Sequence, residues 1–258
     1  MSMKNKAVIF LIFALFSMTL TAQEGKEQAA LKYANSVARY SEGKYQEALN
    51  GWMELYNSGY RSASLDYNIG NACFKLNNVP GSILFYERAL LLKPGGEDIR
   101  YNLQIARSMV VDKLAEIPEL FFVTWYNLIS LSLSSNHWAI ISLVSFILFL
   151  CFVSLYFYTR NYRLKVTGFW LGLLFIIISG SGFAFSSHNR SLVYNNDKAI
   201  IFTPVVNGKS SPDNSGNDLF VIHEGTKVSV GEKVGDWYEI RLSDGNKGWV
   251  SANCLTRL

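Results

Sequence analysis

The chain has 258 residues, of which 50% are hydrophobic and 17% are charged, and its net charge is +4. The mean hydropathy of +0.14 is high for a purely soluble protein and indicates membrane segments. Lysine and arginine form no long run, which argues against nucleic-acid binding, because phosphate contacts need a clustered basic face. Three widely separated cysteines predict small buried side chains rather than a zinc or redox site: Cys73, Cys151 and Cys254.

Residues 1–22 have the three-part layout of a secretory signal peptide. Lys4 and Lys6 give a basic start, and an apolar run from Ala7 to Met18 follows. The run is short for a membrane span, so we expect cleavage, with an uncleaved anchor as the alternative. In both cases the next segment begins outside the cytoplasm.

Residues 30–114 contain an internal repeat with a period of 34 residues. Gly43 and Asn77 hold matching turn positions between pairs of predicted helices. Pro94 ends the second copy, because proline cannot continue a helix. The same residue type opens every copy: Tyr33, Tyr67 and Tyr101.

This pattern resembles the tetratricopeptide repeat (TPR). The second copy carries the family's positions at Gly70, Asn71, Ala72, Phe74, Tyr86, Ala89, Leu90 and Pro94. The first copy departs from them at Ser36, Trp52 and Tyr60. The resemblance implies an α-helical solenoid, in which stacked helix pairs bury their apolar faces and line a concave groove.

The expected groove is a binding surface for a protein partner. The candidate partner-binding residues in it are Tyr33, Tyr67, Asn71, Lys75 and Tyr101. The resemblance also places Val37, Tyr40, Phe74 and Ile105 near the groove. Each tyrosine has core packing as an equal alternative. Asn71 and Lys75 could grip the acidic end of a peptide, or could be two solvated polar residues on an exposed face.

Residues 120–134 are apolar and aromatic, with Trp125 and Tyr126 at their centre. Aromatic rings prefer the boundary between membrane and water, so the pattern predicts an interfacial segment. A packed loop is the alternative.

Two uncharged runs, residues 138–158 and 166–185, each have the length of one transmembrane helix. The short connector, residues 159–165, makes them a helical hairpin, and its positive charges place it in the cytoplasm: Arg160, Arg163 and Lys165. The sequence therefore predicts an inner (cytoplasmic) membrane protein whose N- and C-terminal domains are periplasmic. Neither run has an ionisable residue, which argues against a transporter. Small residues at 179–182 would let another helix approach closely.

Residues 192–258 alternate short β-branched runs with turn-rich gaps, which is typical of a small all-β barrel. Asp244 and Gly245 are a strong hairpin signal. The order of features resembles bacterial SH3 domains, on residues 219–220, 223–226, 236–240 and 248–250.

The SH3 resemblance implies binding of peptides or cell-wall material. The candidate partner-binding residues are Trp237, Tyr238 and Trp249, which could shape a shallow groove. Both tryptophans also occupy positions that commonly pack the barrel, so core packing is the alternative. The chain has no P-loop, HExxH, GxSxG or dinucleotide-binding pattern. We therefore expect no enzymatic activity, no metal and no cofactor.

The order of the parts, with EDIRYNLQIAR after the second repeat, resembles the BatE-type proteins of the Bat aerotolerance system. The resemblance spans essentially the full chain. It implies an inner-membrane assembly with von Willebrand A-domain membrane proteins and, indirectly, a MoxR-type ATPase, and it alone suggests a link to aerotolerance or oxidative stress. We expect a membrane-anchored scaffold. The alternative is a cell-envelope tether or sensor whose SH3-like domain binds peptidoglycan.

Overall fold

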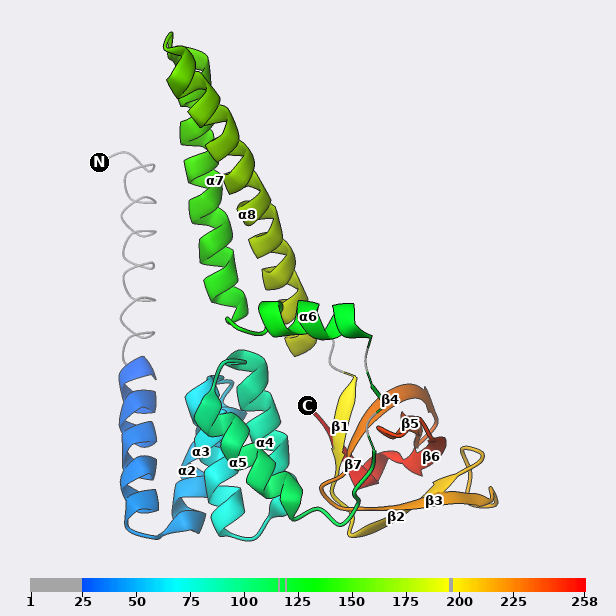
Figure 1. The fold of residues 1–258 in the computed structure, drawn as a ribbon. Helices are drawn as coiled ribbons and strands as arrows, with labels where there is room; N and C mark the ends of the chain where they lie inside the picture. The colour runs from blue at the N-terminus through cyan, green and yellow to red at the C-terminus, as the bar shows by residue number, and fades with distance from the viewer. Residues whose placement is uncertain (1–24, 116, 119, 195–196) are drawn as a thin grey trace, which may run out of the picture.

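The computed structural model describes residues 25–258 except 116, 119, 195 and 196. The predicted signal peptide, residues 1–22, lies outside the described residues. The chain runs from a block of helices, through an apolar helical hairpin, to an antiparallel β-domain (Figure 1).

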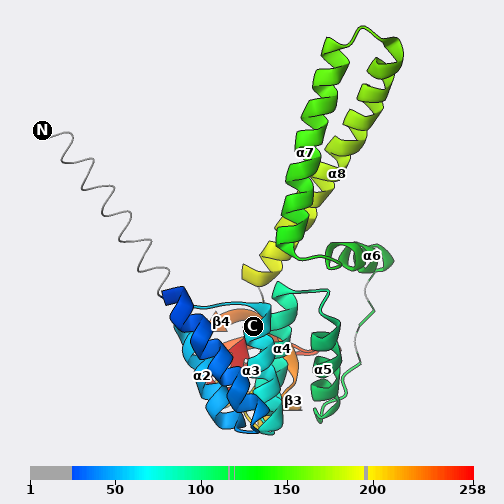
Figure 2. The ribbon, with the colours of Figure 1, turned by 90° about the vertical axis from the view of Figure 1, so that its left-hand side faces the viewer.

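Short helices joined by tight turns form the N-terminal block (Figure 2). Residues 25–41 are helical, and the turn after them contains Gly43, whose φ is +78°. Asn77 takes the equivalent place one repeat later, with a φ of +58°. Glycine and asparagine tolerate this left-handed conformation best, so both predicted turn positions are confirmed. The other helices are α2 (Tyr45–Asn57), α3 (Ala63–Lys75), α4 (Val79–Leu92) and α5 (Glu97–Ser108).

Side chains fix where α3 and α4 begin. Ser62 Oγ accepts a hydrogen bond from the Leu65 amide at 3.1 Å. Asn78 Oδ1 accepts one from the Gly81 amide at 2.9 Å, and Pro80 lies in the first turn of α4. Both caps satisfy amides that have no partner within the helix, so the two helices start at defined residues.

The helices of the block share one apolar core, in which Trp52, Ile69 and Tyr86 are almost fully buried. Helices α3 and α4 approach each other at Gly70, where an added Cβ would lie 2.6 Å from the Tyr86 ring. Only glycine leaves room for that ring, so this position sets the spacing of the helix pair.

Helices α7 (Ser135–Tyr158) and α8 (Tyr162–Tyr194) form a long antiparallel hairpin that extends away from the rest of the protein (Figures 1 and 2). Among the described residues, these two helices are long and apolar enough to cross a membrane. Ser142 and Ser179 each donate a hydrogen bond to the other's carbonyl oxygen, at 2.9 and 3.0 Å. Gly182 packs on the α7 backbone, so part of the predicted small-residue patch faces the hairpin partner itself.

Helix α6 (Phe121–Ser130) lies across the base of the hairpin (Figure 1). The Trp138 indole donates to the Ser130 carbonyl at 2.8 Å, and Asn189 Nδ2 donates to the same oxygen at 2.7 Å. The segment is therefore a helix fixed to both hairpin helices, not the packed loop that was the alternative. Its large apolar side chains are exposed: Phe121, Phe122, Trp125, Leu128 and Ile129.

Seven strands form one antiparallel sheet with the order β3-β2-β6-β5-β4-β1-β7. The all-β region starts at Lys198 rather than at residue 192, because α8 continues to Tyr194 beyond its apolar run. Gly245 has a φ of +94° in the turn between β5 and β6, as the hairpin signal predicted. The strands are β1 (Lys198–Ile201), β2 (Val205–Lys209), β3 (Asp218–His223), β4 (Lys227–Val234), β5 (Trp237–Arg241), β6 (Lys247–Ser251) and β7 (Leu255–Arg257).

The β-domain packs directly against the helical block. Ile200 of β1 is fully buried in the core of the helices, and Phe202 and Leu258 pack on the same core. Glu87 of α4 is paired with Arg107 of α5 and, at 2.8 Å, with Lys227 of β4. The buried apolar side chains and the ion pair between Glu87 and Lys227 together join the two domains.

A single carboxylate, Asp112, fixes the turn between β3 and β4 to the end of the helical block. It accepts hydrogen bonds from the His223 amide at 2.7 Å, from His223 Nδ1 at 2.8 Å and from Thr226 Oγ1 at 2.6 Å. Burial disfavours the charged form of Asp112, but these hydrogen bonds outweigh it and lower its pKa.

Candidate functional site

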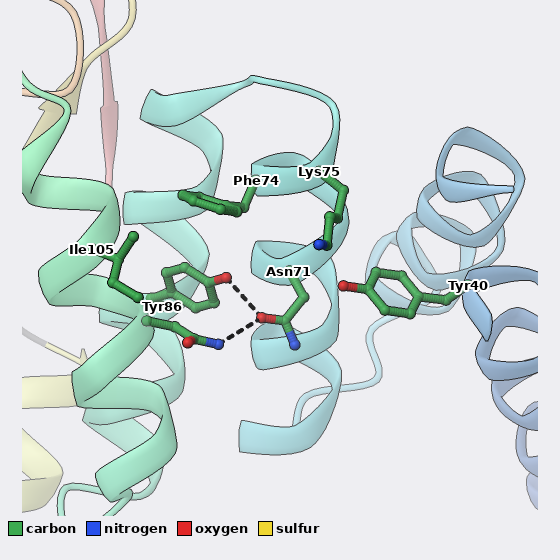
Figure 3. A pocket seen from close by; sticks show the side chains of 7 residues that line it. Tyr40, Asn71, Phe74, Lys75, Tyr86 and Ile105 are labelled. Carbon is green, nitrogen blue, oxygen red and sulfur yellow. Dashed lines mark hydrogen bonds between the residues drawn. The ribbon is translucent and has the colours of Figure 1, made fainter. Parts of the chain in front are cut away.

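A groove opens on the surface of the helical block between the first helix, α3 and α5 (Figure 3). Its volume is about 170 Å³, which suits a few side chains rather than a large cofactor. Its wall combines aromatic, apolar, amide and cationic groups: Tyr40, Asn71, Phe74, Lys75, Tyr86, Asn102 and Ile105.

A small hydrogen-bond network holds the Asn71 amide in one orientation. Its Oδ1 accepts from the Tyr86 hydroxyl at 2.7 Å and from Asn102 Nδ2 at 3.1 Å (Figure 3). Burial raises the pKa of Tyr86, so its hydroxyl keeps the proton that it donates. With its oxygen engaged by two donors, Asn71 presents its NH₂ group to a ligand.

Lys75 supplies the positive charge of the groove. It lies one helical turn after Asn71 on α3, and both side chains project into the same space (Figure 3). Its side chain is exposed and forms no ion pair within the described part of the chain. An ammonium beside an amide NH₂, next to the Phe74 ring, is a suitable receptor for a carboxylate that follows an apolar side chain.

Of the tyrosines predicted for the groove, Tyr40 lines it, whereas Tyr33, Tyr67 and Tyr101 do not. Tyr33 packs on Trp52 and lines a separate pocket, while Tyr67 packs on Tyr86 behind the groove. Tyr101 is 67% exposed and lies outside the groove. The packing alternative therefore describes Tyr33 and Tyr67, and the structure brings together Asn71 and Lys75.

Two residues that line the groove, Tyr86 and Asn102, are not among those that the sequence predicts for it. A signal for Asn102 was available, because Asn68 and Asn102 repeat with the same 34-residue period as the tyrosines. Asn68 Nδ2 donates to the Tyr33 hydroxyl at 2.8 Å, and Asn102 Nδ2 donates to the Tyr67 hydroxyl at 2.9 Å. The recurring contact joins successive helix pairs in equivalent ways.

The aromatic residues predicted for the β-domain divide between its two faces. Tyr238 packs on the barrel core, whereas Trp237 and Trp249 are half-buried and belong to neither apolar core. Glu239 of β5 lies directly opposite Trp249 of β6. Since side chains alternate along a strand, Trp237, Glu239 and Trp249 share the outer face of the sheet.

The cysteines give no reactive site. Burial raises the pKa of the Cys73 and Cys254 thiols to about 11, so both stay protonated and inert. Cys151 is exposed on α7, because a two-helix hairpin buries only the face between its helices. The part of the chain that the structure describes holds no cluster of three metal-ligating side chains.

Comparison with known proteins identifies one part of the chain. Residues 205–256 match the bacterial SH3 domain family. The match starts at β2, so β1 and its contact with the helical block lie outside it. A search of curated proteins finds none that matches the chain. The SH3 prediction is confirmed for this region, and the bacterial SH3 domain is consistent with protein or peptidoglycan binding.

Proposed function

We propose that the protein is a membrane-anchored scaffold whose helical groove binds the acidic or C-terminal end of a partner protein. One observation carries this proposal. The Lys75 ammonium and the Asn71 amide, which hydrogen bonds hold in one orientation, both project into the groove beside an apolar wall. Nothing in this arrangement requires catalysis, so the proposed activity is binding alone. In this interpretation the helical block is a minimal TPR solenoid.

The apolar hairpin supplies the anchor in this proposal. Helices α7 and α8 cross the membrane, and α6 lies in the interface with Phe121 and Trp125 turned into the lipid. Arg160 and Arg163 beside the hairpin turn face the cytoplasm, which puts the groove and the SH3 domain in the periplasm.

The resemblance to BatE-type proteins supplies the candidate partners. We propose von Willebrand A-domain membrane proteins as the direct partners, and a MoxR-type ATPase as an indirect one, with a link to aerotolerance or oxidative stress. An exposed acidic or C-terminal segment on such a partner would suit the Lys75 side of the groove.

The test is an in-cell crosslink followed by purification in detergent and mass spectrometry. We compare the wild-type chain with the Asn71→Ala/Lys75→Ala variant. The control is Lys44→Ala, whose ammonium pairs with Glu42 at 2.9 Å away from the groove. A-domain proteins should be captured by the wild type and the control, and fade at least fivefold with the groove variant. Equal capture by all three would reject the groove as the binding site.

The second candidate function is a cell-envelope tether. The outer sheet face of the SH3 domain favours it, because Trp237 and Trp249 leave aromatic surface open to a glycan or peptide. In a pelleting assay with purified peptidoglycan, the detergent-solubilised chain should bind, and Trp237→Ala/Trp249→Ala should not. Trp125→Ala, on α6, is the matched control. If the double tryptophan variant sediments with peptidoglycan as the wild type does, this face is not the binding site.

A further inference from the structure

A row of exposed apolar side chains runs along α5 and continues the groove of Lys75 and Asn71. Ile105, which lines the groove, is 36% exposed, and Tyr101 and Met109 are 67% and 51% exposed. Met109 directly follows α5 and keeps its helical conformation. The three recur at every fourth position, so they share one side of the helix, with about 6 Å between successive residues along its axis. A helix of a globular protein usually turns such a stripe toward the core, so this row is an unpartnered surface.

The row is only one side chain wide. Its neighbours on the helix are polar: Asp98, Asn102, Gln104 and Ser108. An amphipathic helix carries an apolar face at least about 100° wide, so part of that face would cover polar groups if a helix lay on this row. In an extended segment every second side chain points the same way, about 7 Å apart, which nearly matches the spacing of the row. The row therefore suits an extended segment.

Two asparagine amides in the groove are held in orientations that suit the backbone of such a segment. Asn102 Nδ2 donates to the Tyr67 hydroxyl at 2.9 Å and to Asn71 Oδ1 at 3.1 Å, which engages both of its hydrogens and leaves its Oδ1 as an acceptor. Asn71 has the opposite arrangement, because its oxygen accepts two hydrogen bonds and its NH₂ group remains as a donor. An acceptor and a donor side by side match the N–H and C=O groups of one peptide unit.

The charge of the groove selects one side chain of the segment. Figure 3 shows Ile105 at one side of the groove and Tyr40 at the other, with Asn71 and Lys75 between them. Side chains of an extended segment alternate in direction, so the residue between two that cover the α5 row points toward Lys75. Among the described residues that line the groove, Lys75 is the only charged one, so a second carboxylate there would lack a cation to pair with.

We propose that the groove and the α5 row together bind an extended internal segment of a partner protein, in which one acidic residue stands between two apolar residues. The two apolar side chains cover Ile105 and Met109, and the carboxylate pairs with Lys75. Tyr101 receives the next apolar side chain along the segment. This site is the groove of the proposed function, so the proposal rests on that function and adds the class of sequence that the groove recognises.

The test is selection of a random peptide library on the detergent-solubilised full chain, with the peptides displayed on phage inside a coat-protein loop so that none has a free C-terminus. The enriched peptides should carry Asp or Glu with an apolar residue on each side. Enrichment of apolar residues at every third or fourth position would indicate a helical ligand, and enrichment of acidic residues without apolar neighbours would remove the role of the row. Either result would overturn the proposal.

An enriched peptide is then synthesised, and its Kd is measured by fluorescence polarisation. Ile105→Ser/Met109→Ser should weaken binding at least about tenfold, because the apolar side chains of the peptide lose their contacts, while both replaced residues are exposed and leave the core intact. The control is Leu31→Ser, which removes a side chain that is 61% exposed on the first helix, outside the groove, and should leave the Kd unchanged. A peptide that ends at its acidic residue should bind more weakly, and equal affinity would assign the groove to chain ends instead.

Lys75→Gln separates this proposal from the proposed function. It should weaken binding about tenfold and remove the preference for glutamate over glutamine in the peptide. If Lys75→Gln weakens binding and the row variant does not, the groove still binds a carboxylate and the α5 row has no part in it. If Lys75→Gln changes nothing, or the library yields no binder, the groove itself is not the site.

Discussion

At the scale of single residues, Asp66 and Asp112 are both shielded from water, yet their pKa values shift in opposite directions. Asp112 accepts three hydrogen bonds from the SH3 domain, and these stabilise its charge. Asp66 is 2% exposed, and its Oδ1 accepts no hydrogen bond within the described residues. Burial raises the pKa of Asp66 to about 6, despite the nearby Arg88 and Arg61 guanidinium groups.

Replacing Asp112 with alanine should lower the free energy of unfolding by about 1–3 kcal/mol, because His223 and Thr226 lose their hydrogen-bond acceptor in a part-buried contact. The pKa of Asp112 is lowered on folding, so its stabilisation is present above the ordinary value of 3.8 and disappears as the pH falls through the folded value. Urea denaturation in detergent, followed by tryptophan fluorescence, measures both effects. A variant as stable as the wild type at pH 7 would show that the contact is not formed.

Replacing Asp66 with asparagine should stabilise the chain at pH 7.5. The pKa of this aspartate is raised on folding from 3.8 to about 6, so folding becomes less favourable as the pH rises between those values. The asparagine variant should lack this dependence. Asp98→Asn, at an exposed site on α5, is the control. Denaturation curves at pH 4, 5, 6 and 7.5 give the free energy of unfolding as a function of pH. The account is contradicted if this free energy changes with pH in both variants as it does in the wild type.

At the scale of elements, the packing of α8 on α7 depends on where small residues point. An added Cβ at Gly182 would lie 3.2 Å from the Trp138 carbonyl oxygen, whereas Gly180 has open space around it. We expect Gly182→Val to separate the helices and lower the thermal stability in detergent by several degrees, and Gly180→Val to leave it unchanged. Thermal unfolding followed by circular dichroism compares the pair. The same loss at both positions would refute this packing.

Local patterns predicted most elements, because each depends on neighbours in the sequence. The 34-residue period places the turns at Gly43 and Asn77, and the Asp244-Gly245 turn identifies a hairpin of the SH3 domain. The end of α8 was harder to predict, since helical hydrogen bonding continues past the apolar run to Tyr194. Helix α6 was ambiguous for a similar reason, because its aromatic residues suit both a helix and a loop.

At the scale of the whole molecule, the helical block and the SH3 domain form one contact surface around Gly225. This residue has a φ of +84°, and an added Cβ would lie 2.8 Å from the Val110 side chain. Gly235 has a φ of +56° but open space around it. A side chain at either glycine would therefore strain the backbone, because both have a positive φ. At Gly225 the new side chain would also collide with Val110, whereas at Gly235 it would meet open space.

Gly225→Leu should separate the domains, and Gly235→Leu should only strain its own turn. Hydrogen–deuterium exchange of α4 and α5 should rise in the first variant and stay at the wild-type rate in the second. Unchanged exchange in Gly225→Leu would show that the domains do not depend on this contact.

The contact between domains could not be predicted from one sequence. His223 and Asp112 are 111 positions apart, and neither belongs to a motif that indicates the other. The groove was predicted in part, since the repeat places Tyr40, Asn71, Phe74, Lys75 and Ile105 in it. Tyr86 and Asn102 were not, because their role depends on how three helices meet.

The central claim, that the groove receives a partner protein, is tested most directly by photo-crosslinking from inside it. A benzophenone amino acid replaces Phe74 in the groove or Gln46 on the exposed face of α2, and adducts formed in cells are identified by mass spectrometry. The account predicts a von Willebrand A-domain membrane protein linked at position 74 and absent at position 46. The same adducts from both positions, or only cell-wall fragments at position 74, would contradict it.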